Sequence, residues 1–134
     1  MSKPILFSAY KNSGLISSGN YLDSYDGFLT EYGSSFSLSS GTFNAQRDGV
    51  YSFSASAYHY DPGQNRLSVM KNGQKELEFL SYARETNDNS DTLNFSWMMV
   101  LEAGDNVRLK VTAGRFVCGL TYNCIFSGEF VREI

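Results

Sequence analysis

The sequence predicts a single all-β domain, and three observations carry that prediction. Aromatic residues make up 15% of the chain and occur with 12 Gly and only 2 Pro, a usage that favours strands and turns over helices. Short segments of alternating apolar and polar residues recur about every ten residues, which is the spacing of a sandwich or barrel. The length of 134 residues fits one core. We therefore expect one domain over residues 1–134, with residues 1–3 as either a native start or a disordered start added for expression.

The first half of the chain predicts one confident strand among several short ones. A first strand is expected over residues 4–10, followed over residues 11–41 by short strands and turns rich in Ser, Gly and Asn. The clearest strand covers residues 51–57, in which Tyr, Phe and Ala alternate with three serines. Because successive side chains point to opposite faces of a strand, the aromatic side is expected to face the core and the serine side the solvent.

A hairpin is predicted around Asn72-Gly73, a pair that supplies the positive φ angles of a tight reversal. A strict two-residue turn would set Val69 opposite Glu76. One extra loop residue instead sets Val69 opposite Leu77 and Leu67 opposite Phe79, so that apolar residues share a face. The pattern therefore predicts a longer or bulged loop.

A second hairpin is predicted further along the chain. Apolar residues alternate with polar ones over residues 95–101 and again over 107–111, and residues 102–105 form a short polar turn between them. We expect these two strands to pair as an antiparallel hairpin. A last strand is expected over residues 122–131.

Charge and hydropathy exclude several classes of partner. The formal net charge is −3 and the sequence pI is about 5.0, which gives no electrostatic footprint for nucleic acid. The longest apolar run, residues 97–101, is far shorter than the roughly 20 residues of a membrane-spanning helix. No cationic stretch followed by an apolar run precedes Phe7, so this chain shows no signal peptide. We expect neither nucleic acid binding nor membrane insertion.

Catalytic residues and metal ligands are not predicted either. His59 is the single histidine and is expected as an edge residue at the end of a strand that runs into a turn, without the Gly-x-Ser-x-Gly turn of a nucleophile. Asp23, Asp26 and Glu31 lie in a Ser- and Gly-rich segment, where carboxylates are usually solvated turn formers. The run Asn87-Asp88-Asn89-Ser90-Asp91 fails the EF-hand pattern because its sixth position lacks Gly and its twelfth is Met98. We expect no enzyme activity, no cofactor and no metal.

Cys118 and Cys124 are separated by five residues, which is compatible with a bridge across the base of a loop. Two free buried thiols are a nearly equal alternative. An oxidised pair would support an extracellular location, because cytosolic thiols stay reduced.

A series of landmarks occurs in order along nearly the whole chain: Phe7-Ser8-Ala9, Gly41-Thr42-Phe43, Gly49-Val50-Tyr51-Ser52-Phe53-Ser54, Lys71-Asn72-Gly73, Leu101-x-x-Gly104-Asp105-x-Val107 and Phe126-Ser127-Gly128. In this order they resemble the globular head domain of the complement C1q family, within the tumour-necrosis-factor-like superfamily. Two departures are Ser39-Ser40-Gly41, where the family often has Asn and Thr-Gly, and a short loop at residues 113–123. The resemblance implies a secreted, homotrimeric, ten-stranded antiparallel jelly roll with a binding role.

The aromatic content bears on the expected trimer. With 20 aromatic residues in the chain, some rings are expected either to pack between subunits or to lie on the surface with wet tyrosine hydroxyls.

The ligand-binding residues are expected at one end of the sandwich. If consecutive strands reverse direction, the connections near residues 58–66, 84–91 and 113–122 emerge together. Aromatic faces suit sugar rings and arginine suits a carboxylate. The predicted ligand-binding residues are Tyr58, Tyr60, Arg66, Arg84, Arg115 and Tyr122.

The functional prediction is a lectin-like pattern-recognition protein of innate immunity that binds glycans or microbial surfaces, similar to stand-alone invertebrate C1q-domain lectins. Three weak sites on one trimer gain avidity when they engage together. The alternative is a signalling or extracellular-matrix module that binds a protein receptor, resembling cerebellin- or adipokine-type C1q heads.

Overall fold

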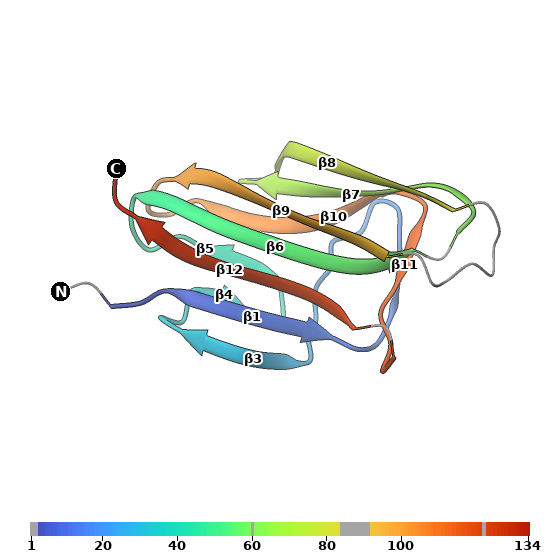
Figure 1. Ribbon diagram of the computed structural model, residues 1–134, viewed down its shortest axis with the longest axis horizontal. Coiled ribbons are helices and arrows are strands. Elements are labelled where there is room, and N and C mark those ends of the chain that lie inside the picture. Colours follow the sequence, from blue (N-terminus) through green and yellow to red (C-terminus); the bar gives the residue numbers. More distant parts are fainter. Residues whose placement is uncertain (1–2, 60, 84–91, 122) are drawn as a thin grey trace.

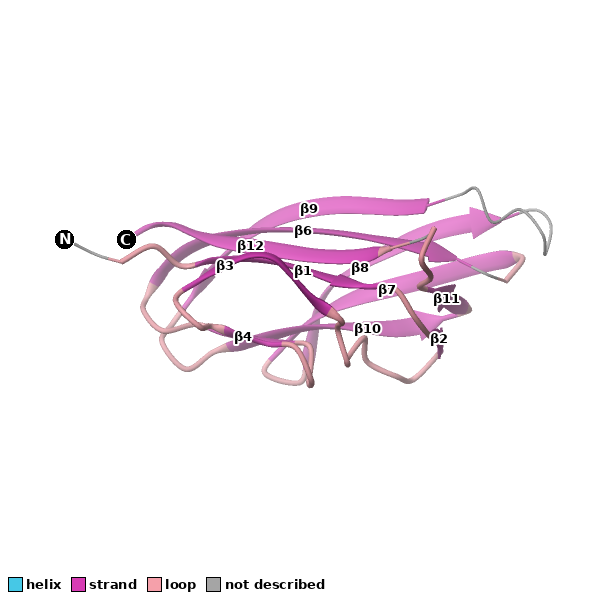
Figure 2. Cartoon of the chain, turned by 90° about the horizontal axis from the view of Figure 1, so that it is seen from below, coloured by secondary structure: helices cyan, strands magenta, loops and turns pink. Residues whose placement is uncertain are grey.

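The computed structural model describes residues 3–59, 61–83, 92–121 and 123–134, which form two packed antiparallel sheets and, within these ranges, no helix (Figures 1 and 2). One sheet has the order β2-β11-β6-β12-β1-β3, with β9 also paired to β6. Its strands are β1 (Leu6–Lys11), β2 (Leu15–Ser17), β3 (Gly27–Tyr32), β6 (Gly49–His59), β9 (Thr92–Leu101), β11 (Arg115–Val117) and β12 (Cys124–Arg132).

The second sheet has the order β4-β5-β10-β7-β8. Its strands are β4 (Phe36–Ser37), β5 (Thr42–Asn44), β7 (Gly63–Lys71), β8 (Gln74–Ala83) and β10 (Asn106–Ala113). Five strands of the first sheet (β3, β1, β12, β6 and β9) and these five make up the expected ten-stranded jelly roll. The three-residue strands β2 and β11 are an addition to it at one end of β6.

The hydrophobic core lies between the two sheets, because each strand turns its apolar residues inward. On β6, Tyr51, Phe53 and Ala57 are almost completely buried, and Val107 and Leu109 of β10 face them from the other sheet. Aromatic rings pack against one another across the core, with centroids 4.4 Å apart for Phe7 and Phe36 and 5.3 Å apart for Phe53 and Trp97. Such pairs contribute beyond their buried area.

About half of the described aromatic residues are buried in this core, and others, such as Tyr10 and Tyr58, lie on the outer surface. Among the described aromatic residues, only Tyr32 and Tyr82 are largely exposed. The rings fit because they stack and meet edge to face, and because Gly128 leaves room between Phe7 and Phe53. Whether the remaining rings pack between subunits or lie wet on the surface stays a prediction.

The β7–β8 hairpin confirms the predicted register. Leu67 lies opposite Phe79 and Val69 opposite Leu77, with a bulge between Val69 and Met70. The turn residues Asn72 and Gly73 have φ angles of 52° and 82°, the left-handed conformation that this turn requires.

The predicted pairing of residues 95–101 with 107–111 is wrong. Both segments are strands joined by a polar turn, but β9 pairs with β6 in one sheet and β10 pairs with β5 and β7 in the other. The turn spans the two sheets and is held by backbone bonds to Ala45 and by the Asp48 carboxylate, which accepts the Ala103 N–H at 2.8 Å. The alternation therefore identified two apolar faces that meet across the core, and not two neighbours in one sheet.

Candidate functional site

Several of the segments predicted to carry ligand-binding residues meet at one end of the sandwich. Strand β6 ends at His59, β7 begins at Gly63 and β11 begins at Arg115, and all three lie at the end of the molecule opposite to both termini (Figure 1). Of the six predicted binding residues, the structure describes Tyr58, Arg66 and Arg115. Tyr60, Arg84 and Tyr122 lie outside the described residues, as does the acidic run at residues 87–91.

Arg115 is held at this end by an ion pair with Asp61. Its Nε and Nη2 atoms lie 2.8 and 2.6 Å from Oδ1 of Asp61, and the two side chains are 39% and 26% exposed. A guanidinium oriented by a carboxylate keeps its planar set of donors in a fixed direction. The ion pair therefore presents Arg115 at the surface in one orientation.

The buried side chain of Asn65 organises the loops beneath Arg115, a role that the sequence did not indicate. Its Nδ2 donates to the carbonyl oxygens of Asp61 at 2.8 Å and Gly63 at 3.3 Å, and its Oδ1 accepts the backbone N–H of Arg115 at 3.2 Å. The amide also occupies the space that a Cβ at Gly114 would fill. Asn65 is completely buried, and its bonds tie three loop positions together.

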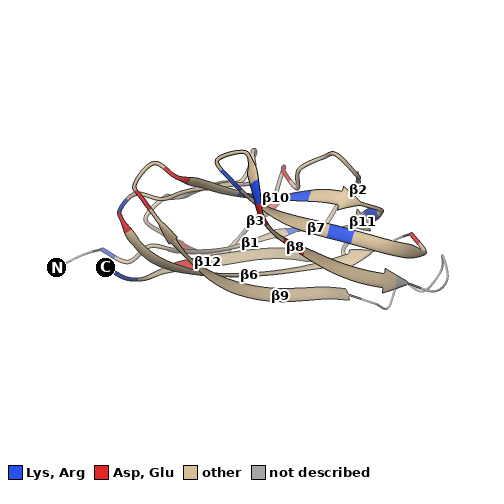
Figure 3. Cartoon of the chain, turned by 90° about the horizontal axis from the view of Figure 1, so that it is seen from above, with Lys and Arg blue, Asp and Glu red and all other residues tan. Residues whose placement is uncertain are grey.

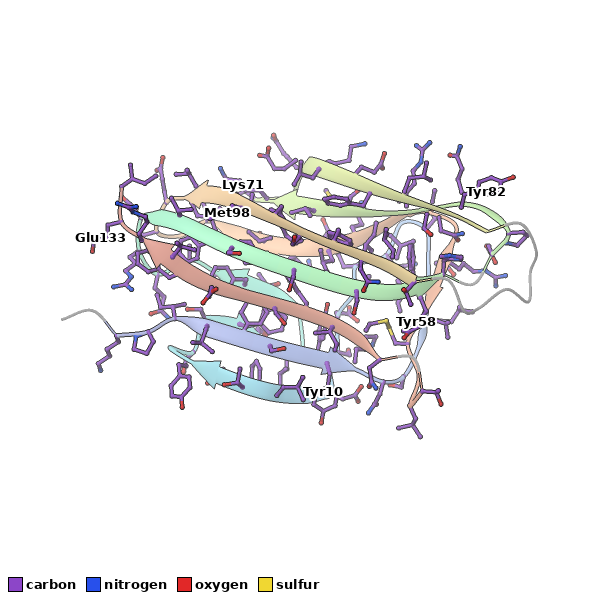
Figure 4. The ribbon with its side chains drawn as sticks, viewed as in Figure 1. Tyr10, Tyr58, Lys71, Tyr82, Met98 and Glu133 are labelled. Carbon is purple, nitrogen blue, oxygen red and sulfur yellow. A yellow bond between two sulfur atoms is a disulfide. The ribbon has the colours of Figure 1, made fainter. Side chains whose placement is uncertain are left out.

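Arg66 and Tyr58 lie on opposite outer faces of the sandwich and so do not share a pocket. Arg66 is on the outer face of the β4-β5-β10-β7-β8 sheet, where its guanidinium bonds Gln64 at 2.6 Å and lies 3.6 Å from the Glu78 carboxylate. The pKa of Glu78 is lowered, chiefly because its carboxylate accepts the Thr112 hydroxyl at 2.8 Å. Tyr58 lies near the end of β6 and points outward from the other sheet (Figure 4).

The outer face of the other sheet carries a row of hydroxyl side chains. The register aligns one hydroxyl residue from each of five strands, namely Thr30, Ser8, Ser127, Ser54 and Ser96. The Ser8 and Ser127 hydroxyls are 2.7 Å apart, and the row borders two hollows of about 260 and 440 Å³. Alternation predicted serines on an outer face, but only the register shows that they align.

Apolar side chains flank this row. Met98 is 61% exposed on β9 and Leu29 is 66% exposed on β3, and Tyr10 lies on the same face (Figure 4). We call the hydroxyl row and these flanking residues the outer serine face. The two hollows form a shallow trough over β1, β12, β6 and β9.

The structure corrects one detail of the predicted non-catalytic residues. His59 ends β6, as expected, but it is completely buried on the inward face of that strand and is not an edge residue. Its place in the alternation with Ala55 and Ala57 directs it to the core. The Asp26 carboxylate accepts the Asn12 N–H at 2.7 Å and that of Glu31 accepts the Ser34 N–H at 2.5 Å, so both serve turns. Over the described ranges, no group of three or more His, Cys, Asp or Glu side chains converges as a metal site would require.

Cys118 and Cys124 form a disulfide that links the end of β11 to the start of β12, with the Cα atoms 5.4 Å apart. Strand β11 continues along β6 from where β12 ends its pairing, so the bridge holds two segments that share one neighbour.

Charged residues of both signs are interspersed over the fold (Figure 3). The described part of the chain contains no helix long and apolar enough to cross a bilayer.

Comparison with known proteins supports the architecture. The model of the C1q domain family matches residues 6–131. The globular domain of zebrafish complement 1qA is 21% identical with a TM-score of 0.73, over 97% of this chain and 99% of that one. The Eiger TNF of S. frugiperda is 14% identical with a TM-score of 0.68, over 97% and 95% of the two chains. Pika GITRL is 14% identical with a TM-score of 0.56, over 98% of each chain. These solved structures share the fold.

Proposed function

Because the chain belongs to the C1q domain family, we propose that it is an extracellular recognition module, without catalytic activity, that works as a homotrimer and binds glycans or microbial surface patterns. The family assignment supports recognition or signalling as the general role. The choice of glycans rests on the chemistry of the loop end around Arg115.

The observation that carries the ligand proposal is the orientation of Arg115. Its guanidinium is fixed by Asp61 and its backbone by the buried Asn65, while the side chain remains partly exposed. A pre-oriented donor set loses little conformational entropy when it binds an acidic or hydroxylated ligand. Because Arg66 and Tyr58 lie on opposite outer faces, they would contact the ligand bound at Arg115 only if that ligand extended around the end of the sandwich. A branched glycan or a microbial surface is large enough to do so.

The outer serine face supports self-association. Met98 and Leu29 are both more than half exposed there, and nothing in the described chain covers the trough. Exposed apolar groups, Met among them, are typical of a surface that packs against another protein. A second and third copy of this chain are the occupants that a homotrimer requires.

The trimer is tested by mass measurement in solution. The protein should have a mass of about three chains at micromolar concentration. Ser54→Arg places a long cation in the trough and should yield single chains, whereas Lys75→Gln on the other sheet should remain trimeric. A wild-type protein with the mass of one chain would rule out the proposed assembly.

Ligand binding is tested on a glycan array with the trimeric protein. Arg115→Gln should abolish array binding, while Lys75→Gln, which also removes an ion-paired surface cation, should not. Binding that persists in Arg115→Gln would reject the loop end as the site. A silent array together with a tight protein partner would favour the alternative, a signalling or extracellular-matrix module that binds a receptor.

A further inference from the structure

A cavity of about 430 Å³ lies where the chain leaves β1, passes through β2 and returns along β10, and it adjoins the loop end because its wall residue Ser17 pairs with Arg115. Backbone bonds from Leu22 to Leu109 and from Val111 to Asn20 attach the returning segment to the edge of β10. Tyr21 thereby lies opposite Lys110. The cavity walls include Lys11 from β1, Arg108 from β10, and Tyr21, Asp23 and Asn20 from the returning segment.

Lys11 is the most unusual of these residues because it is 94% buried, its relative exposure being 6%. Its Nζ donates to the carbonyl oxygen of Ser24 at 3.3 Å and lies against Gly14. Among the described residues no carboxylate forms an ion pair with it. An ammonium group has three donors, and a buried cation without a counter-charge is costly.

Arg108 adds a second cation with unused hydrogen-bonding capacity. Its guanidinium stacks on the Tyr21 ring with Cζ 3.8 Å from the centroid, and its Nη2 donates to the Ser40 carbonyl at 2.9 Å. Its Nε is buried and has no hydrogen-bond partner. A buried unsatisfied donor in a native fold calls for an explanation, such as a bound water or ion.

The local charge is positive although the chain as a whole is negative. Lys11 and Arg108 face one lining carboxylate, that of the exposed Asp23, and Lys110 lies 5.3 Å from the Tyr21 ring centroid. An anionic group in the cavity would supply the missing partner for both cations. The rest of the wall places the polar side chains of Ser17 and Asn20 beside Leu15 and Ile16, so the rest of the ligand should carry hydroxyl groups together with an apolar face.

We propose that this cavity binds a monosaccharide that carries a carboxylate, with the carboxylate held by Lys11 and Arg108 and the ring hydroxyls meeting Ser17, Asn20 and Asp23. The volume lies in the range of small-molecule sites. The cavity adjoins the loop end through Ser17, but its lining does not include Arg115. The proposal therefore does not depend on glycan binding by Arg115.

The test compares methyl β-D-glucuronide with methyl β-D-glucoside, which differ only in whether C6 is a carboxylate. In an amide NMR titration of the full chain, the glucuronide should give saturable chemical-shift changes at Gly14 and Gly19. The glucoside should bind at least about tenfold more weakly, which corresponds to a difference in binding free energy of about 1.4 kcal/mol. Shifts confined to Gly63 and Gly114 would place the sugar at the loop end and refute the cavity site. Absence of shifts at Gly14 and Gly19, or equal affinity for the two sugars, would refute it as well.

Two variants test the role of the cations. Lys11→Met removes the buried charge at similar size and should weaken glucuronide binding about tenfold or more, whereas Lys75→Gln should leave it unchanged. Arg108→Lys keeps the charge but loses the planar donor set and should weaken binding severalfold, which tests the proposal even if Lys11→Met does not fold. The assignment would be overturned if either folded cavity variant bound the glucuronide as tightly as the wild-type protein does. It would also be overturned if the wild-type protein bound inorganic phosphate as tightly as the glucuronide.

Discussion

Replacing Gly128 with alanine should destabilise the fold by overfilling the centre of the core. Gly128 lies on β12 between Phe7 of β1 and Phe53 of β6, which are its register neighbours. A Cβ at this position would come within 2.5 Å of Phe53 Cδ1 and 2.8 Å of Phe7 Cε1. Both rings are almost completely buried, so neither can move aside without displacing others.

The expected effect can be estimated from general packing energetics. Extra methyl groups in well-packed cores cost about 1–3 kcal/mol. With about 2.1 cal/mol/K of unfolding entropy per residue, a domain of 134 residues loses about 4 °C in Tm for each kcal/mol. Gly128→Ala should therefore lower Tm by about 4–11 °C, measured by calorimetry at one fixed protein concentration because oligomers have concentration-dependent Tm values.

Two further variants separate the steric cause from others. Ser54→Ala removes an outward-facing hydroxyl and should change Tm little. Phe53→Leu removes ring atoms that the new methyl group meets, so the Gly128→Ala and Phe53→Leu double variant should be less destabilised than the sum of the two single variants. A Gly128→Ala protein as stable as the wild type, or fully additive effects, would refute the steric reasoning.

Two other predictions concern the disulfide and the β9–β10 turn. Peptide mapping without reductant should find Cys118 joined to Cys124. Replacing both with serine should lower the free energy of unfolding by about 2 kcal/mol, the chain-entropy value for so short a loop. Free thiols in protein purified without reductant would contradict this. The pKa of Asp105 is lowered from its ordinary value of 3.8, chiefly by a hydrogen bond from Asn72 and then by one from the Glu102 backbone N–H. The ionised Asp105 carboxylate therefore stabilises the fold above pH 3.8, and this stabilisation is lost as the pH falls through the lower folded-state pKa. Asn72→Gly keeps the left-handed turn but removes the side-chain amide that bonds Asp105. Urea titrations of this variant should therefore show a smaller loss of stability on acidification. An unchanged dependence of stability on pH would show that the hydrogen bond from Asn72 does not set the pKa of Asp105.

The parts of the fold that were predictable from the sequence are those set by local rules. Strand alternation identified the inward residues of β6 and β10, and the Asn72-Gly73 turn together with the apolar pattern predicted the bulged hairpin. Alternation specifies which face of a strand is buried but not which strand lies beside it. For this reason β9 and β10 were correctly identified as strands and wrongly paired.

The functional surfaces depend on contacts between distant positions, which a single sequence does not reveal. Lys11 and Arg108 lie on strands of different sheets, and their convergence depends on how the segment after β2 returns along β10. Asn65 acts through loop carbonyl groups that have no sequence signature. Arg66 and Tyr58 were correctly assigned to one end, but the alternation of their separate strands turns them to opposite faces.

The location of the cavity has a consequence for binding by an assembled protein. Lys11 shares the inward face of β1 with Phe7 and Ala9, whereas Ser8 and Tyr10 point to the outer serine face. A partner chain packed on the outer serine face would therefore leave the cavity accessible. A trimer would display three such cavities, and a polymer of acidic sugars that reached two of them would bind more tightly than a monosaccharide by the effective concentration of the second site. If Ser54→Arg yields folded single chains, affinity for the monosaccharide should be unchanged while affinity for the polymer falls, and a parallel loss of both would show that the cavity depends on the subunit contact.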